Sequence, residues 1–356
     1  MQKIAVQEAI GKILCHDLSR IVKDQMKGPQ FKKGHIIREE DIPMLLSMGK
    51  EQIYVWEDKE GFLHEDEAAK RLAAICRGKN IRESGPSEGK IELYAEIDGL
   101  FCVNPACIDS INALGEIALV TRRTYSALKK GELIAGLKAI PLLIAEEKIK
   151  EAESIAKNSR GAEGSLAFEP LLNILPYFLK SAAIITTGSE VAKGLIKDTL
   201  SPVVQEKLTT FGIDVISRQV SDDKRGTILA AIEKALDEKP DLILCTGGMS
   251  VDPDDNTPGA IKEALHARGG SLVSYGAPVF PGAMFLLAYF SDGTPILGLP
   301  ACVMYAKTTI FDILLPRLAA GVKITRDDIT KMGHGGLCLS GKGCPPPCHF
   351  PNCFFG

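Results

Sequence analysis

The chain has 356 residues, of which 45% are hydrophobic and 24% charged, with a formal net charge of −3 at pH 7. This composition is typical of a globular protein of two or three domains, and its charge gives no basic surface for nucleic acid or an anionic membrane. The charged N-terminal segment lacks a signal peptide's apolar run, and no stretch of about 18 apolar residues predicts a membrane span. With ten cysteines scattered along such a chain, we expect reduced thiols in the cytoplasm.

Residues 1–60 predict a small mixed α/β unit. A turn at 32–34 leads into a short strand at 35–37, a helix begins at 39–43 and ends before Gly49, and residues 52–56 form a strand. The isolated His16 and His35 are interpreted as ordinary polar residues.

Residues 61–160 alternate short strands with helical segments and predict an inserted, compact β-rich domain. The predicted strands lie at 90–95, 98–103 and 117–121, with a further apolar run at 137–145. The predicted helices lie at 65–77, 108–114 and 147–157. Residues 157–164 are the most linker-like stretch of the chain.

Residues 175–325 predict an α/β domain with a parallel sheet. Within 182–261, three apolar runs each end in a glycine-rich or acidic turn, and a helix-like segment follows each turn. The turns begin at Gly188, at Ser221-Asp222 and at Gly247-Gly248. This repeated strand–loop–helix pattern indicates parallel strands with covering helices, whose ligands bind at the carboxyl ends of the strands. We therefore expect one pocket to collect all three turns.

The helices after these turns have recognisable start signals. Ser201-Pro202 predicts a helix with Ser201 as its N-cap, residues 221–223 open a helix that runs to Leu236, and Thr257-Pro258 begins another. Beyond them we expect strands at 271–276, 283–290 and 295–299, and a long apolar helix over 301–320. Pro300 follows the last strand and faces the same end of the sheet as the turns.

Backbone N–H groups dominate the third turn. Gly247, Gly248 and Ser250 offer N–H groups and a hydroxyl, which suit a phosphate. Gly188 in the first turn permits a tight turn and close approach of a ligand. A phosphate beside several carboxylates usually needs a bridging metal ion, so we expect Mg²⁺.

Carboxylates flank all three turns, and they belong to Asp198, Asp222, Asp254 and Asp255. Ionised carboxylates only accept hydrogen bonds, so they can hold Mg²⁺ or bind the N–H donors of a purine- or pterin-like ring. A plainer interpretation is that Asp222 and Asp255 merely cap helices. The recurrence of such turns at corresponding strand ends favours a site.

The stretch 246–260, TGGMSVDPDDNTPGA, resembles the glycine motif of the fold shared by molybdopterin adenylyltransferase and molybdopterin molybdenumtransferase. Its first three residues and Thr257-Pro258 match the adenylyltransferase motif, and Asp255 falls on the motif's aspartate, while Asp254 replaces an arginine. Residues 249–251 are instead similar to the molybdenumtransferase motif.

Three further segments carry the resemblance, which covers about 180–320. Residues 220–223 resemble the V-P-D-D/E motif, whose acidic residue is tied to activity in the family. Residues 187–198 resemble its T-G-D-E-L…D-S-N segment, with Ser189 in place of an aspartate. Residues 297–300 resemble the start of its G-L-P-G-N-P loop, but 301–303 replace G-N-P.

The resemblance implies a molybdopterin-binding α/β domain and a role in molybdenum cofactor assembly. The first expectation is a molybdenumtransferase: it binds adenylylated molybdopterin, receives molybdate and hydrolyses the adenylate. The alternatives are adenylyl transfer from ATP to molybdopterin, and a non-catalytic carrier or insertion chaperone. The implied partners are molybdopterin or its adenylate, molybdate and a molybdoenzyme acceptor, and we expect a homo-oligomer that binds neither nucleic acid nor membrane.

The resemblance also assigns the site residues. Asp222 and Asp255 are expected to act in catalysis and to bind Mg²⁺. The residues expected to hold pterin and phosphate are Gly188, Ser189, Asp198, Gly247, Gly248, Ser250 and Pro300.

The C-terminal segment 333–356 is rich in cysteine and proline. Its cysteines have the spacing C-x5-C-x3-C-x4-C and are Cys338, Cys344, Cys348 and Cys353. Thiolates gathered this closely suit zinc or an iron–sulfur cluster, although the spacing matches no common motif. The alternative is a tail with unpaired thiols.

Overall fold

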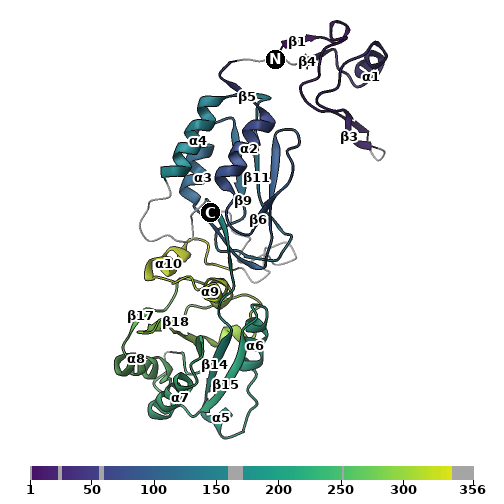
Figure 1. The fold of residues 1–356 in the computed structure, drawn as a ribbon. Helices are drawn as coiled ribbons and strands as arrows, with labels where there is room; N and C mark the ends of the chain where they lie inside the picture. The colour runs from purple at the N-terminus through teal and green to yellow at the C-terminus, as the bar shows by residue number, and fades with distance from the viewer. Residues whose placement is uncertain (1, 23–25, 56–59, 159–170, 251, 339–356) are drawn as a thin grey trace. The chain divides into compact units, whose positions relative to one another are not determined.

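The computed structural model describes residues 2–22, 26–55, 60–158, 171–250 and 252–338. The chain divides into two compact units (Figure 1). Unit 1 comprises Met1–Ile97, Cys102–Thr124 and Lys130–Ile174, and unit 2 comprises Asp98–Phe101, Tyr125–Lys129 and Leu175–Gly356. None of the helices in the described residues is long and apolar enough to cross a membrane.

The first part of unit 1 contains two antiparallel strand pairs and a short helix. Strand β1 (Gln2–Ala5) pairs with β4 (Gln52–Val55), and β2 (Leu18–Val22) pairs with β3 (Met26–Phe31). Helix α1 (Ile42–Ser47) follows a single 3-10 turn, as the sequence predicted to within a few residues. The strand predicted at 35–37 is not formed, and Ile36 makes only an isolated bridge with Ile13.

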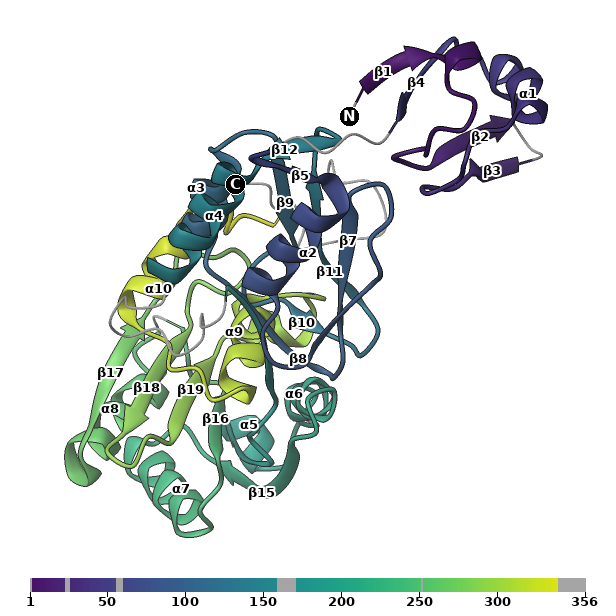
Figure 2. The same ribbon diagram turned by 45° about the horizontal axis from the view of Figure 1, so that its top comes forward.

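The rest of unit 1 is built around an antiparallel sheet in the order β6-β7-β11-β9. These strands are Ile81–Glu83, Lys90–Ala95, Leu133–Ala139 and Ile117–Thr121. Strand β5 (Phe62–His64) pairs with β12 (Leu143–Ala145). The three helices predicted in this region are present as α2 (Glu65–Cys76), α3 (Pro105–Asn112) and α4 (Glu146–Asn158). Helix α2 packs on β7 and β11 (Figure 2).

Strands β8 (Gly99–Val103), β10 (Ala127–Leu128) and β13 (Leu172–Pro176) form a small separate sheet in the order β10-β8-β13. Its β8 strand corresponds to the strand predicted at 98–103.

Unit 2 contains a sheet in the order β15-β14-β16-β19-β18-β17. The strands are β14 (Ser181–Thr187), β15 (Asp214–Ser221), β16 (Leu242–Thr246), β17 (Gly270–Tyr275), β18 (Leu286–Phe290) and β19 (Pro295–Leu299). Strands β14, β15, β16 and β19 pair in parallel, whereas β18 is antiparallel to both β17 and β19. The predicted parallel-sheet α/β domain is therefore confirmed.

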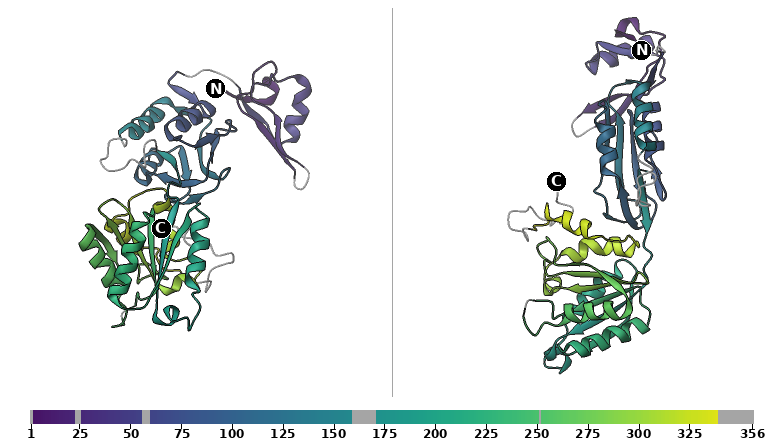
Figure 3. Two further views of the ribbon diagram at one scale, coloured as in Figure 1. Left: turned by 60° about the horizontal axis from the view of Figure 1, so that its bottom comes forward. Right: turned by 90° about the vertical axis from the view of Figure 1, so that its left-hand side faces the viewer.

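Helices cover both faces of this sheet (Figure 3). One face packs against α6 (Leu200–Thr209), α9 (Ile310–Ala319) and α10 (Arg326–Thr330), and the other against α7 (Arg225–Asp237) and α8 (Thr257–Arg268). Leu244 and Leu297 contribute to the first core, and Ile185 and Ile243 to the second. Burial on both faces explains why these strands have uninterrupted apolar sequences.

Two predicted helices differ from the structure. The helix predicted over 301–320 is interrupted: a 3-10 turn spans Ala301–Met304, and α9 begins only at Ile310. A new N-terminus forms because Thr309 Oγ1 accepts from the Phe311 N–H at 3.2 Å, while Asp312 Oδ2 accepts from the Thr309 N–H at 2.8 Å. This capping box starts a helix within an otherwise apolar stretch.

The second difference concerns Ser201, which is not an N-cap. Helix α6 begins one residue earlier, at Leu200, and its N-cap position, Thr199, makes no side-chain capping bond. The carboxylate of Asp198 instead accepts from the N–H groups of Leu200 and Ser201, each at 3.0 Å. Asp198, three residues before Ser201, thus has the capping role that the Ser-Pro pair suggested for Ser201.

Candidate functional site

The carboxyl edge of the unit 2 sheet gathers the turns that the sequence singled out. Strands β14, β15, β16 and β19 run parallel, so the turns that follow them emerge at one edge. The chain passes from β14 to β15 on one side and then to β16 on the other side of β14. Open α/β sheets bind ligands at such a reversal of strand order.

The first and second turns are hydrogen-bonded to each other. Gly188, with φ of 148°, donates its N–H to the carbonyl of Ser221 at 3.1 Å. The Ser189 N–H donates to Asp223 Oδ2 at 2.7 Å. Asp223, rather than the predicted Asp222, is therefore the acidic residue that reaches the first turn.

Asp222 makes contacts at the start of α7. Its Oδ1 accepts from the Lys224 N–H at 3.1 Å and from the hydroxyl of Thr227. The bond from Thr227, with help from Lys224, lowers the pKa of Asp222. These are the contacts of a residue that closes the first turn of a helix, which the sequence left open as the plainer interpretation.

The glycines of the third turn face protein atoms. Gly247 has φ of 88°, and a Cβ there would lie 2.3 Å from the backbone oxygen of Thr187. A Cβ on Gly248 would lie 2.6 Å from Thr257 Oγ1. Since the hydroxyls of Thr187 and Thr257 are 3.1 Å apart, the end of β14 and the start of α8 enclose both glycines. Side chains at these two positions would therefore collide with the protein itself, whatever their N–H groups bind.

Asp255 closes the acidic loop after the third turn. Its Oδ2 accepts from the Ser250 N–H at 2.7 Å, and its own N–H donates to the carbonyl of Asp252 at 2.9 Å. Asn256, not Asp255, occupies the N-cap position of α8, and no side chain caps that helix. The Asp255 carboxylate is therefore not a helix cap, and it takes the Ser250 N–H that was predicted to face a phosphate.

Asp198 links the end of β14 to the start of α6. Besides capping α6, its Oδ2 accepts from Thr186 Oγ1 at 2.9 Å. Partial burial alone would raise the pKa of Asp198, but the hydrogen bonds from Ser201, Thr186 and Leu200 outweigh burial and lower it. Its oxygens are occupied by the protein itself, so Asp198 holds the loop in place.

The end of β19 packs against the third turn. A Cβ on Gly298 would lie 2.5 Å from Met249 Sδ, which shows how closely the buried Met249 covers that strand. Pro300, two residues further on, is buried at the same edge. The structure thus brings the turns of β14, β15, β16 and β19 together, and sequence reasoning missed Asp223, Thr187 and Asn256 among the residues that join them.

Metal-ligating side chains are not clustered in the described residues, where no three His, Cys, Asp or Glu side chains are placed to hold a metal ion. Cys344, Cys348 and Cys353 lie outside those residues. Cys338 is half-buried, and its N–H donates to the carbonyl of Phe280 at 2.8 Å.

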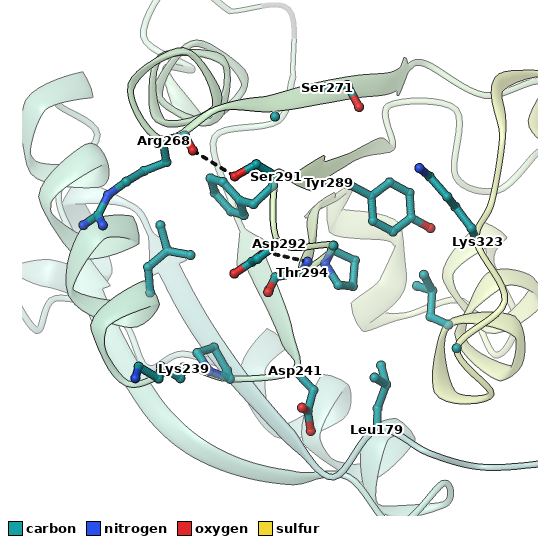
Figure 4. Close-up of a pocket in the computed structure, with 18 of the residues that line it drawn as sticks. Leu179, Lys239, Asp241, Arg268, Ser271, Tyr289, Ser291, Asp292, Thr294 and Lys323 are labelled. Carbon is teal, nitrogen blue, oxygen red and sulfur yellow. Dashed lines mark hydrogen bonds between the residues drawn. The ribbon is translucent and has the colours of Figure 1, made fainter.

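A cavity of about 920 Å³ lies at the opposite, amino edge of the sheet (Figure 4). Asp241, Arg268, Tyr289, Thr294 and Lys323 are among its lining residues. The Asp241 carboxylate accepts two backbone N–H groups at the start of β14, at 2.8 and 2.9 Å. None of the predicted site residues lines this cavity.

Comparison with known proteins places the family match on unit 2. Residues 183–320 match the family described as "Probable molybdopterin binding domain", and residues 3–57 match a domain of unknown function, DUF8806. Over 90 residues the chain is 38% identical to a CinA-like protein of Pseudothermotoga lettingae, an alignment that covers 25% of this chain and 22% of that protein. The chain spans about a fifth of the length of the curated relatives it matches.

Two solved structures show low overall similarity. The protein CinA with unknown function from Thermoplasma acidophilum is 19% identical, with a TM-score of 0.33 over 39% of this chain and 98% of that one. The tungsten cofactor synthesizing protein MoaB from Pyrococcus furiosus is 18% identical, with a TM-score of 0.34 over 42% of this chain and 98% of that one.

The family match includes every turn described above, from Gly188 to Pro300. It agrees with the resemblance that the motifs indicated and with the parallel sheet that carries them. The match to the molybdopterin-binding family therefore falls on the part of the chain that carries the predicted motifs.

Proposed function

We propose that unit 2 binds molybdopterin at the carboxyl edge of its sheet and that the protein acts in molybdenum cofactor biosynthesis. The observation that carries this proposal is the joining of three turns at the strand-order reversal, within the range that matches the family. A ligand at this edge meets backbone groups of three separate turns, held in place by their own hydrogen bonds.

The charge of the edge suits a pterin. Asp252 and Asp254 are exposed on the loop after the third turn, next to Asp255. Their carboxylates accept hydrogen bonds only, and a pterin ring presents several N–H donors. Ser189 and Ser250 add hydroxyl groups that can either donate or accept.

Mg²⁺ fits this edge as an ion shared with the ligand. Carboxylate oxygens are its preferred protein ligands, and it commonly takes only one or two of them together with substrate phosphates. Asp255 uses Oδ2 for the Ser250 N–H, and its Oδ1 has no hydrogen bond among the described residues. Asp222 is less suited, because its Oδ1 is taken by Lys224 and Thr227 and its Oδ2 lies 3.8 Å from the Lys224 ammonium. When bound, Mg²⁺ would neutralise phosphate charge and polarise the bond to be cleaved.

The first proposed reaction is molybdenumtransferase-like. Water attacks the adenylyl phosphorus of adenylylated molybdopterin, the bond to the pterin phosphate breaks, and AMP leaves. The two dithiolene sulfurs then bond to the molybdenum of molybdate, and one molybdate oxygen leaves as water with the two thiol protons. Asp255 is the proposed carboxylate of this step. Adenylyl transfer from ATP is the second candidate, favoured by the spacing of Asp255 and Thr257-Pro258.

A non-catalytic carrier or insertion chaperone is the third candidate. It is favoured because the carboxylates of Asp198 and Asp222 accept hydrogen bonds from groups of the protein itself. The replacement of G-N-P by residues 301–303 favours it too.

In the deciding experiment, one sample of the purified full chain is incubated with molybdopterin, ATP, Mg²⁺ and molybdate. A parallel sample is incubated with adenylylated molybdopterin, Mg²⁺ and molybdate. Release of AMP from the adenylylated pterin supports the transferase, and pyrophosphate from ATP supports the adenylyltransferase. Saturable binding with neither product supports the carrier. Failure to bind either form of the pterin would refute the proposed function.

A further inference from the structure

Asn256 contacts the second turn and the acidic loop that follows the third turn. We propose that Asn256 is a positioning residue: its side-chain amide clamps the two turns together and thereby fixes the carboxylate of Asp223 against the first turn. The proposed function enters only in the ligand measurement below, because the clamp itself can be measured without a ligand.

The contacts of Asn256 are unusual for its position. An asparagine immediately before a helix ordinarily accepts a hydrogen bond from the first turn of that helix. Here Nδ2 of Asn256 donates instead to the backbone oxygen of Asp223 at 3.0 Å and to that of Asp254 at 3.0 Å. Helix α8 consequently begins without a side-chain cap, so the amide is committed to joining loops.

The clamp extends to the first turn through Asp223. While the Asp223 backbone oxygen is held by Asn256, its Oδ2 accepts from the Ser189 N–H at 2.7 Å. Asp223 is thus hydrogen-bonded through its main chain to Asn256 and through its side chain to Ser189. Displacing the Asp223 backbone would move the carboxylate and weaken the bond to Ser189.

The clamp also borders the acidic loop. Asp254 and Asp255 precede Asn256, and Asp255 Oδ2 holds the Ser250 N–H at 2.7 Å. The bond from Asn256 to the Asp254 oxygen fixes the end of that loop. Asn256 therefore sits where the backbone of the second turn and the backbone of the acidic loop meet.

The chemistry of the clamp predicts an order of damage. Asn256 donates two hydrogen bonds to two acceptors, so Asn256→Ala removes both donors and leaves carbonyls that water can reach. Asn256→Asp has nearly the same shape but brings an acceptor-only, charged group against the same two oxygens. The second variant should therefore disturb the turns more than the first, although it is the closer match in size.

The test measures amide hydrogen exchange by NMR in the ligand-free full chain. Without the Asn256 bonds the Asp223 backbone is no longer held, so we expect the Ser189 amide to exchange about tenfold faster in Asn256→Ala and faster still in Asn256→Asp. The control is Asp241→Ala, which removes an acceptor of two backbone N–H groups at the opposite edge of the same sheet.

This control separates the clamp from general destabilisation. If Ser189 exchange rises in the Asn256 variants and not in Asp241→Ala, the clamp is supported. Unchanged exchange at Ser189 in Asn256→Ala, or an equal rise in the control, would overturn it.

A second measurement asks whether the clamp serves the ligand. We expect molybdopterin to bind Asn256→Ala about tenfold more weakly than wild type, and Asp241→Ala as tightly as wild type, at a temperature where all are folded. Wild-type affinity in Asn256→Ala would overturn the positioning role. Absence of binding in wild type would refute the proposed function, and the exchange result would still decide the clamp.

Discussion

Replacing Gly247 by alanine tests most sharply how the third turn is built. The new Cβ would lie 2.3 Å from the Thr187 backbone oxygen, 2.9 Å from Thr187 Oγ1 and 3.1 Å from the Thr187 carbonyl carbon. Two of these atoms are backbone atoms at the end of β14, so they cannot be moved by a side-chain rotation. Either β14 or β16 must shift at the edge where the site lies.

The size of the effect follows from two costs. Alanine at the φ of 88° is strained by about 1 kcal/mol, and overpacking against fixed backbone adds about 1–3 kcal/mol, so we expect a loss of about 3 kcal/mol. Gly212 is the matched control: its φ is 69°, and a Cβ there has no atom within 4 Å. Gly212→Ala should cost about 1 kcal/mol, and the entropy that both variants remove from the unfolded chain cancels between them.

The assay is differential scanning calorimetry of the full chain, following the transition of unit 2. In a domain of this size, 1 kcal/mol shifts Tm by about 2–4 °C, so Gly247→Ala should lower Tm by about 6–12 °C and Gly212→Ala by about 2–4 °C. Equal shifts in the two variants would refute the close contact between Gly247 and Thr187.

Three further predictions concern the site, its pH dependence and the tail. We expect Mg²⁺ to strengthen molybdopterin binding in wild type but not in Asp255→Asn, with little change in stability; an unchanged Mg²⁺ effect in titration calorimetry would remove Asp255 from the metal. Because the pKa of Asp198 is lowered in the folded state, its contribution to stability is present above the unfolded pKa of about 4 and is lost as pH falls through the lower folded value. Asp198→Asn should accordingly show a shallower loss of stability below about pH 4 in acid unfolding, and parallel curves would argue against this. We also expect the purified protein to carry about one equivalent of zinc or iron and to lose it when residues 339–356 are deleted. This deletion keeps the hydrogen bond from the Cys338 N–H to the Phe280 carbonyl. Elemental analysis that finds no metal in the intact chain would contradict this prediction.

The strands of unit 2 could be predicted because their signals are local. An apolar run followed by a glycine or aspartate turn and a helix start is visible at Thr187-Gly188, Ser221-Asp222 and Thr246-Gly247. The parallel direction and the shared edge then follow from that repeated pattern. The family resemblance rests on the same residues, so one set of motifs predicted both the fold and the edge of the sheet at which a ligand is expected.

The division of roles within each turn could not be read in this way. Asp222 and Asp223 are adjacent and identical in type, and only the backbone path decides which carboxylate reaches Ser189 and which turns back to Thr227. Gly247 was likewise predicted only to offer its N–H group to a phosphate, because the sequence does not show that the Thr187 backbone oxygen lies 2.3 Å from the position of a Cβ at Gly247. These are long-range contacts set by the packing of neighbouring strands.

The interrupted helix at 301–320 is a different case. Its apolar composition is continuous, which favoured one long helix, but Thr309 and Asp312 have the spacing of a capping box and mark a new helix start. That signal was present in the sequence and was outweighed by composition. Asn256 is the opposite case, because its position before Thr257-Pro258 suggests a cap, whereas its amide donates to two loops.

The central claim is that molybdopterin binds at the carboxyl edge of the unit 2 sheet. The most direct test is an equilibrium titration of the full chain with molybdopterin, followed by hydrogen exchange of the saturated complex. We predict saturable binding, with amides protected at 188–190, 222–224, 247–250 and 252–256. Absence of binding, or protection confined to the amino-edge cavity around Asp241, Tyr289 and Lys323 (Figure 4), would contradict it.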